Sequence, residues 1–147
     1  LIINPIISNN YIIIIITMKS FQIIAALMLV TVTLAYARNA YFVFSDNTNE
    51  FTIKLTNPTL IQHARDLIAN RTEEGRGVMG IIKRGDTFYN WQWSYYLDPA
   101  TISFFDMAAE VCDASIDYVE NHLNEVGGAL LPGNRWCPWQ SHLVREL

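Results

Sequence analysis

The chain has 147 residues, of which 51% are hydrophobic, and a formal net charge of −4. After residue 37 it carries nine Lys and Arg residues against fourteen Asp and Glu residues, a net charge of −5. This acidic balance, with no basic stripe, argues against binding to nucleic acid or to an anionic membrane surface. The 110 residues after residue 37 suffice for one domain with one core.

The first seventeen residues, LIINPIISNNYIIIIIT, contain no charged residue and are mostly Ile and Asn. Ile, Asn and Tyr have AT-rich codons, which indicates translated upstream sequence of an AT-rich gene. The alternative is a membrane-inserting leader, but the apolar run Ile12–Ile16 is shorter than the ~20 residues that span a bilayer. We therefore expect residues 1–17 to be upstream translation or an unstructured leader.

Residues 18–37 have the pattern of a cleaved secretory signal peptide. Lys19 supplies a positive charge, Phe21–Leu34 is an uncharged apolar core, and Ala-Tyr-Ala at 35–37 has the small-x-small pattern of a signal peptidase site. A transmembrane anchor is the alternative, but the apolar stretch is short for one and Arg38 follows it closely. The sequence thus predicts a signal peptide at 18–37 and a secreted, extracellular domain at 38–147.

Both cysteines of the chain, Cys112 and Cys137, lie in the expected domain. An even pair in an oxidising compartment is expected to form a disulfide, and closing this loop is worth on the order of 3 kcal/mol in chain-entropy models. A metal site built on two sulfurs would need His at ligand spacing, which the sequence lacks. Asn70 begins the one N-x-S/T sequon after residue 37, which predicts an N-linked glycan there.

The first half of the domain predicts a β-hairpin followed by a helix. Tyr41–Phe44 is β-prone, a polar turn cluster follows, and Phe51–Leu55 alternates apolar and polar residues. Asn57 is expected to cap the next helix, with Pro58 at its first position and apolar residues at helical spacing up to residue 69. Residues 71–77 predict a polar loop and residues 78–82 another strand.

The second half is less regular. Trp91–Leu97 has the clearest alternation in the chain and predicts a strand with Trp91 and Trp93 in the core. Residues 101–111 fit a helix or a strand, and we favour a strand. Asp113 is then expected to cap a helix that ends at the two glycines at 127–128, and Leu130–Leu147 predicts a disulfide-pinned loop with a short closing strand. This order predicts an α+β fold: an antiparallel sheet with one or two packed helices in a single disulfide-linked domain.

The sequence contains no HExxH, GxSxG, P-loop or CxxC motif. His63 and His122 fall on the polar sides of their expected helices. Glu110, Asp113 and Asp117 form the densest acidic group, which could serve a small hydrolase, although such groups more often cap a helix and face water. We therefore expect no enzyme, no cofactor and no metal site.

The loop Leu131–Trp139 is rich in aromatic residues, stiffened by proline and tethered by the expected disulfide. Such a loop loses little entropy on binding and is suited to recognition. The expected binding residues are Pro132, Asn134, Arg135, Trp136 and Trp139.

Several stretches of the domain, most specifically Glu110-Val111-Cys112-Asp113 and Trp136-Cys137-Pro138-Trp139, resemble a family of small secreted domains often labelled calmodulin-binding protein. The resemblance covers about residues 41–147 and implies calmodulin as a partner. Calmodulin's targets are basic amphipathic helices, whereas the helix expected at residues 57–69 carries one Arg, one Asp and one His.

Taken together, these patterns predict a secreted, non-enzymatic domain that binds a protein partner. One alternative is a protease inhibitor that inserts Leu131–Trp139 into a protease cleft. The others are a carbohydrate-binding module that stacks a glycan ligand on exposed aromatic side chains, those of Trp136 and Trp139, and a calmodulin-binding protein as the family label implies.

Overall fold

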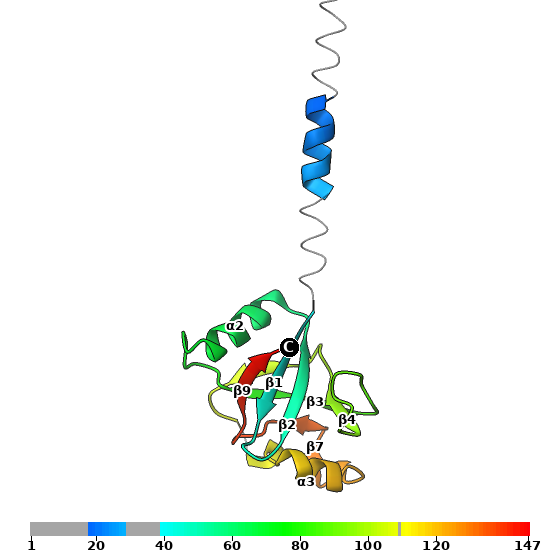
Figure 1. Cartoon of the computed structure of the whole chain (residues 1–147). Coiled ribbons are helices and arrows are strands. Elements are labelled where there is room, and N and C mark those ends of the chain that lie inside the picture. The colour runs from blue at the N-terminus through cyan, green and yellow to red at the C-terminus, as the bar shows by residue number, and fades with distance from the viewer. Residues whose placement is uncertain (1–17, 29–38, 109) are drawn as a thin grey trace, which may run out of the picture. The chain divides into compact units, whose positions relative to one another are not determined.

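The computed structural model describes residues 18–28, 39–108 and 110–147. The expectation for residues 1–17, and the expected cleavage site at 35–37, lie outside the described residues. Residues 18–28 are helical, and none of the helices described is long and apolar enough to cross a membrane. The chain divides into two compact units, Leu1–Ala37 and Arg38–Leu147. The second unit carries the fold shown in Figure 1.

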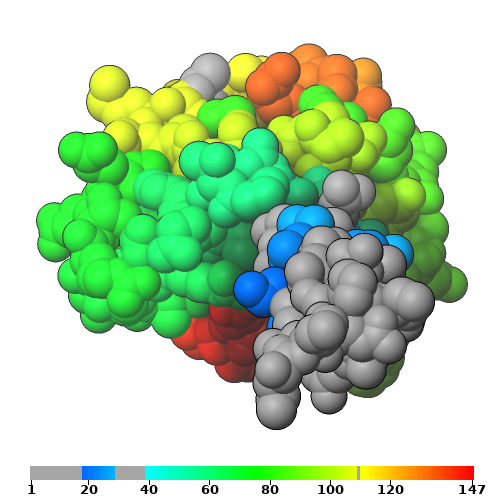
Figure 2. Space-filling view, turned by 90° about the horizontal axis from the view of Figure 1, so that it is seen from above, coloured from blue at the N-terminus to red at the C-terminus, as the bar shows by residue number. Residues whose placement is uncertain are grey.

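Strands β1 (Ala40–Ser45) and β2 (Glu50–Leu55) form the expected antiparallel hairpin. Asp46 shapes the turn, because its Oδ1 accepts hydrogen bonds from the backbone N–H groups of Thr48 and Asn49 at 3.0 and 2.7 Å. Strand β9 (His142–Glu146) pairs antiparallel with the other edge of β1. The predicted closing strand is therefore confirmed. In Figure 2 the C-terminal residues, in red, form part of the surface.

Helix α2 (Pro58–Ile68) begins where the sequence predicts. The Asn57 side chain accepts a hydrogen bond from the backbone N–H of Thr59 at 2.8 Å, and Pro58 occupies the first turn, where its missing N–H costs nothing. The buried face of α2 includes Ile61 and Ala64. The helix lies beside β9 in Figure 1.

Strand β3 (Gly77–Arg84) is the centre of a second sheet. It pairs antiparallel with three short strands, β4 (Tyr95–Leu97), β5 (Ser103–Phe105) and β8 (Arg135–Trp136). The predicted α+β fold with antiparallel pairing and one disulfide is confirmed. Most strands belong either to this sheet or to the separate sheet β2-β1-β9. The remaining two, β6 (Val126–Gly127) and β7 (Leu130–Pro132), form a short parallel pair.

The strand predicted over Trp91–Leu97 is wrong in its first half, because only Tyr95–Leu97 is extended and paired. Residues 91–94 belong to a loop whose side chains bond to distant backbone, which replaces the pairing of a strand. Trp91 is 79% exposed instead of buried, and Trp93 is half-buried.

The region 101–111 is neither a helix nor a continuous strand. Strand β5 covers three residues, and a 3₁₀ helix, η1 (Glu110–Cys112), follows after residue 108. Helix α3 (Ile116–Asn121) starts after Ser115, not after the predicted cap Asp113, and it ends before the two glycines. The Asp113 carboxylate is engaged elsewhere, with the backbone of Trp139.

The core joins the hairpin to the second sheet through aromatic rings around Trp136, which is fully buried. Its ring lies 5.7, 5.1 and 5.5 Å from those of Phe44, Phe51 and Tyr95. Its indole N–H donates to the Ala114 carbonyl at 2.8 Å. Trp136 was predicted as a binding residue, and that prediction is wrong, because β8 pairs with β3 and turns this ring inward.

Candidate functional site

The predicted disulfide between Cys112 and Cys137 is present, with the two Cα atoms 5.2 Å apart. The backbone N–H of Cys137 also donates to the Cys112 carbonyl at 2.8 Å. These two links join η1 to the chain just after β8. The segment Pro138–Ser141 therefore leaves the core from a fixed point.

Trp139 stands on this segment and is 47% exposed. Its backbone N–H donates to Oδ1 of Asp113 at 2.9 Å. Two residues on, the N–H of Ser141 donates to the Pro138 carbonyl at 3.2 Å, which closes a tight turn. The indole is thus presented to solvent from a backbone that is held on both sides.

Beside Trp139 lies a groove of about 580 Å³, which we call the Trp139 groove. Trp139, Phe105 and Met107 line it, with Gly77 and His142. A Cβ at Gly77 would overlap the Phe105 ring, so the glycine lets this ring pack directly on the backbone of β3. Met107 is 91% exposed, and its flexible thioether suits it to contacts with varied apolar side chains.

On the other side of Gln140 and Ser141 lies a smaller hollow of about 280 Å³, which we call the acidic pocket. Three carboxylates line it, those of Asp46, Asp113 and Asp117. Gln140 and Ser141 line both this pocket and the Trp139 groove, so the two hollows are neighbours.

One carboxylate of the acidic pocket, that of Asp117, is held in its charged form. The hydroxyl of Ser115 donates to Asp117 at 2.7 Å, and this hydrogen bond holds the pKa of the Asp117 carboxyl below its ordinary value. Ser141 is only 5% exposed, and its buried hydroxyl has no hydrogen-bond partner within the described part of the chain. No group of three or more His, Cys, Asp or Glu residues in that part could hold a metal ion.

The residues predicted in the Leu131–Trp139 loop are divided by the fold. Only Trp139 lines the groove. Pro132 ends β7 and is exposed. The Asn134 backbone carbonyl accepts from Ile82 at 2.8 Å, and the Arg135 guanidinium lies 3.8 Å from the sulfur of Met79. Most of the loop is therefore a turn packed along β3 instead of a free recognition loop.

The groove residues Phe105 and Met107 and the pocket residue Asp46 were not predicted from the sequence. They come from segments 32 to 93 residues away from Trp139, and no local pattern marks them as neighbours. The acidic group predicted from Glu110, Asp113 and Asp117 is only partly correct. Asp113 and Asp117 share the pocket with Asp46, whereas Glu110 does not line it.

Asn70, the predicted glycan acceptor, is exposed just after the end of α2. Its backbone has a positive φ of 54°, which asparagine tolerates better than most residues. It borders a shallow hollow with Arg76 and His142, two residues that also line the Trp139 groove. The glycan itself stays a prediction.

The chain matches no curated protein and no solved structure. A family model described as the BP-74 N-terminal domain matches residues 38–147, which is the whole of the compact second unit. BP-74 is the name of a calmodulin-binding protein family, consistent with the resemblance seen in the Cys112 and Cys137 segments. The chain therefore belongs to the BP-74 N-terminal domain family.

Proposed function

We propose that this domain is a secreted, non-enzymatic binding module that recognises an extended, basic segment of a partner protein. The observation that carries the proposal is the pairing of two hollows, which meet at Gln140 and Ser141. One is the Trp139 groove, whose apolar part is formed by Trp139, Phe105 and Met107 and whose lining also includes Arg76 and Asp106, and the other is the acidic pocket. The first hollow suits an apolar anchor, and the second suits the Lys or Arg of the same segment.

The apolar half resembles the hot spots of protein interfaces. Tryptophan is enriched among residues that dominate binding energy, and Trp139 lies next to Met107 and Phe105 in a groove of about 580 Å³. Its backbone is already held by Asp113 and the disulfide. A partner therefore loses less binding energy to ordering this surface.

The acidic half supplies the preference for a basic partner. Asp113 and Asp117 accept the hydrogen bonds of Trp139 and Ser115 through Oδ1, so the second oxygen of each carboxylate can bind an incoming cation. The domain's net charge of −5 further attracts cationic segments and repels acidic ones.

Two of the alternatives receive less support. A protease inhibitor would need an exposed Leu131–Trp139 loop, but Leu131 and Trp136 are core residues. Calmodulin is acidic and takes up basic amphipathic helices, whereas α2 carries one Arg against one Asp and α3 carries Asp117 and Glu120 with no Lys or Arg. The family name keeps calmodulin as the second candidate.

Fluorescence anisotropy tests the proposal with the full chain, purified with its disulfide formed. The probes are short labelled peptides with a Phe or Leu anchor and Lys a few residues away, and the same peptides with Glu in place of Lys. We expect the Lys peptides to bind, and Trp139→Ala to weaken them by about tenfold or more.

Two matched pairs separate the halves of the site. Tyr118→Ala removes an exposed aromatic ring on α3 and should leave affinity unchanged. Asp117→Asn should weaken only the Lys peptides, whereas Glu125→Gln removes an exposed charge elsewhere and should not. Full affinity in Trp139→Ala, equal affinity for Glu peptides, or binding of Ca²⁺-calmodulin but of no Lys peptide would refute the proposal.

The secreted state has its own test. The N-terminal sequence of the protein recovered from the medium of its native host should begin at Arg38, and its mass should show both cysteines oxidised. Recovery only from cell extract, with the Met18 leader attached, would contradict export.

A further inference from the structure

A second surface, separate from the Trp139 groove, carries exposed aromatic rings. The loop of residues 85–94, between β3 and β4, presents Phe88 and Trp91, which are 81% and 79% exposed. The rings of Phe88, Tyr89 and Tyr41 contact one another, with centroids 5.1 to 5.6 Å apart. We call Tyr41, Phe88, Tyr89 and Trp91 the aromatic platform.

The loop is held in place by Asn90, which lies between the exposed rings and is 2% exposed. Its side-chain oxygen accepts from the backbone N–H of Thr52 at 3.0 Å, and its side-chain nitrogen donates to the Tyr95 carbonyl at 3.2 Å. The oxygen and the nitrogen of this one side-chain amide therefore both hold the loop, the first to β2 and the second to β4.

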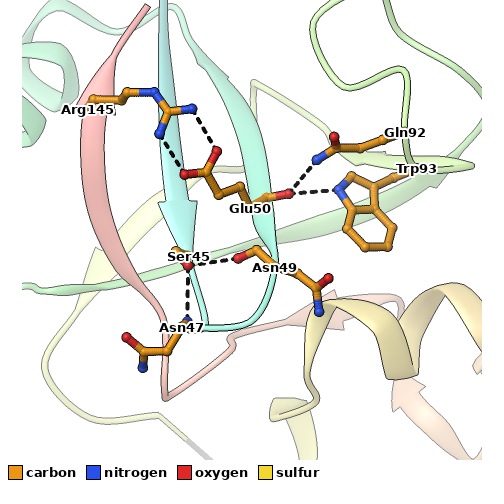
Figure 3. A network of polar contacts seen from close by, with 7 residues as sticks. All are labelled: Ser45, Asn47, Asn49, Glu50, Gln92, Trp93 and Arg145. Atoms are coloured by element: carbon orange, nitrogen blue, oxygen red, sulfur yellow. Dashed lines mark hydrogen bonds and ion pairs between the residues drawn. The ribbon is translucent and has the colours of Figure 1, made fainter.

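Further anchors lie at Glu50, as Figure 3 shows. Gln92 Nε2 and Trp93 Nε1 both donate to the Glu50 carbonyl oxygen, at 2.7 and 2.9 Å. Ser94 bonds to the Glu120 carboxylate through its N–H and its hydroxyl, at 3.0 and 2.7 Å. A loop with this many long-range hydrogen bonds presents Phe88 and Trp91 in defined positions, and their exposure is not a result of a loose loop.

Next to the aromatic platform lies a hollow of about 200 Å³. Trp91 and Tyr89 line it together with Gln92, Glu50 and Arg145. Arg145 holds the Glu50 carboxylate in a two-point ion pair, with N–O distances of 2.6 and 2.7 Å (Figure 3). Aromatic rings thus lie directly beside planar polar groups with adjacent donors and acceptors.

This combination matches the chemistry of a sugar ring. A pyranose has an apolar C–H face, which stacks on aromatic rings, and a rim of neighbouring hydroxyls, which bond to planar carboxylate, guanidinium and amide groups. The hollow is smaller than the ~300–1,000 Å³ of sites for drug-sized ligands, so it suits one ring of a longer chain.

We propose that the aromatic platform and the Glu50–Arg145 pair form a binding site for a neutral oligosaccharide, with one sugar ring stacked on Trp91. The preference for a neutral chain follows from charge: Glu50 and Arg145 neutralise each other, and the acidic domain repels anionic glycans. The site differs from the tryptophans that the sequence suggested for a glycan, since Trp136 is buried and Trp139 lines another groove.

Isothermal titration of the full chain tests this site, after a glycan array has ranked neutral oligosaccharides. The probes are cellohexaose and chitohexaose, with oligogalacturonate as the anionic arm. We expect a neutral chain to bind and Trp91→Ala to weaken it at least tenfold. Phe88→Ala should weaken it less, because Phe88 does not line the hollow.

Tyr118→Ala is the matched control, because this exposed ring on α3 lies outside the platform. Trp91→Ala should keep the wild-type melting temperature and the wild-type affinity for Lys peptides. A failure of the glycan proposal can therefore be told apart from a failure of the proposed peptide site at the Trp139 groove. The proposal is overturned if no neutral glycan binds at millimolar concentration or if Trp91→Ala binds as well as wild type. It is equally overturned if the platform captures a protein and no glycan.

Discussion

The backbone N–H of Trp139 donates a hydrogen bond to the carboxylate of Asp113 across 2.9 Å, next to the disulfide that joins their two segments. This bond orders the one exposed tryptophan of the segment after β8. It also places a carboxylate of the acidic pocket at the edge of the Trp139 groove. One residue thereby links both halves of the proposed binding site.

Two replacements of Asp113 should separate its role in ordering the backbone of Trp139 from the effect of its charge on peptide binding. Asp113→Ala removes the acceptor, so we expect faster amide hydrogen exchange at Trp139 and Ser141 and a stability loss of about 1 kcal/mol. Asp113→Asn keeps an acceptor oxygen and should preserve protection while losing preference for Lys peptides. Equal exchange rates in wild type and Asp113→Ala would show that the bond does not order the segment.

Trp136 should be a stability residue and not a binding residue. Trp136→Phe leaves the Ala114 carbonyl without its 2.8 Å donor and shrinks a fully buried side chain. The expected loss is about 2–3 kcal/mol of unfolding free energy in urea denaturation. The matched variant Trp91→Phe alters an exposed ring and should change stability by less than about 0.5 kcal/mol. Similar losses in both would contradict the burial of Trp136.

The disulfide should contribute measurably to stability. Cys112→Ser with Cys137→Ser should lower the free energy of unfolding by about 3 kcal/mol, because the unfolded chain regains the freedom of the open loop. Wild-type protein in reductant should lose a similar amount, and the double variant should be insensitive to reductant. If the stability of the wild-type protein did not change in reductant, the disulfide would not contribute to it.

Stability should fall in acid, through the ion pairs of β9. Hydrogen bonds from Arg145 and Arg65 hold the pKa values of the Glu50 and Glu146 carboxyls below their ordinary 4.5. A carboxyl with a lowered folded-state pKa stabilises the fold above its ordinary pKa, and this contribution is lost as the pH falls through the lowered value. The melting temperature should therefore drop below about pH 4.5.

Arg65→Met tests the assignment of this effect. It removes the partner of Glu146, which sits 2.6 Å away, so the melting temperature should fall at pH 7 and the further drop in acid should be smaller than in wild type. Arg135→Met is the control: the Arg135 guanidinium contacts the uncharged sulfur of Met79, so its loss should leave the acid profile as in wild type. An identical acid profile in Arg65→Met and wild type would show that this pair does not carry the pH dependence.

Some elements were predictable because their cause is local. The period-two pattern of β2, the Asn57 cap of α2 and the short apolar strand β9 each depend on neighbouring residues, and each was found within a few residues of its predicted place. The disulfide followed from the number of cysteines and the expected compartment.

Other predictions failed because local patterns do not report distant partners. The alternation in residues 91–94 looks like a strand, but Gln92 and Trp93 bond to Glu50, more than 40 residues away. Asp113 resembles a helix cap, but its carboxylate is used by Trp139, 26 residues along the chain.

The fold class, the hairpin, the first helix of the domain, the closing strand and the cysteine pair could all be inferred from the amino-acid sequence, since they follow from side-chain period, capping chemistry and composition. Which tryptophans face solvent depends on contacts between distant segments, and these become visible only in the folded domain. Trp136 and Trp139 are three residues apart, yet one is in the core and the other lines a groove. The pairing of β8 with β3 turns the first inward, and the disulfide and Asp113 hold the second at the surface.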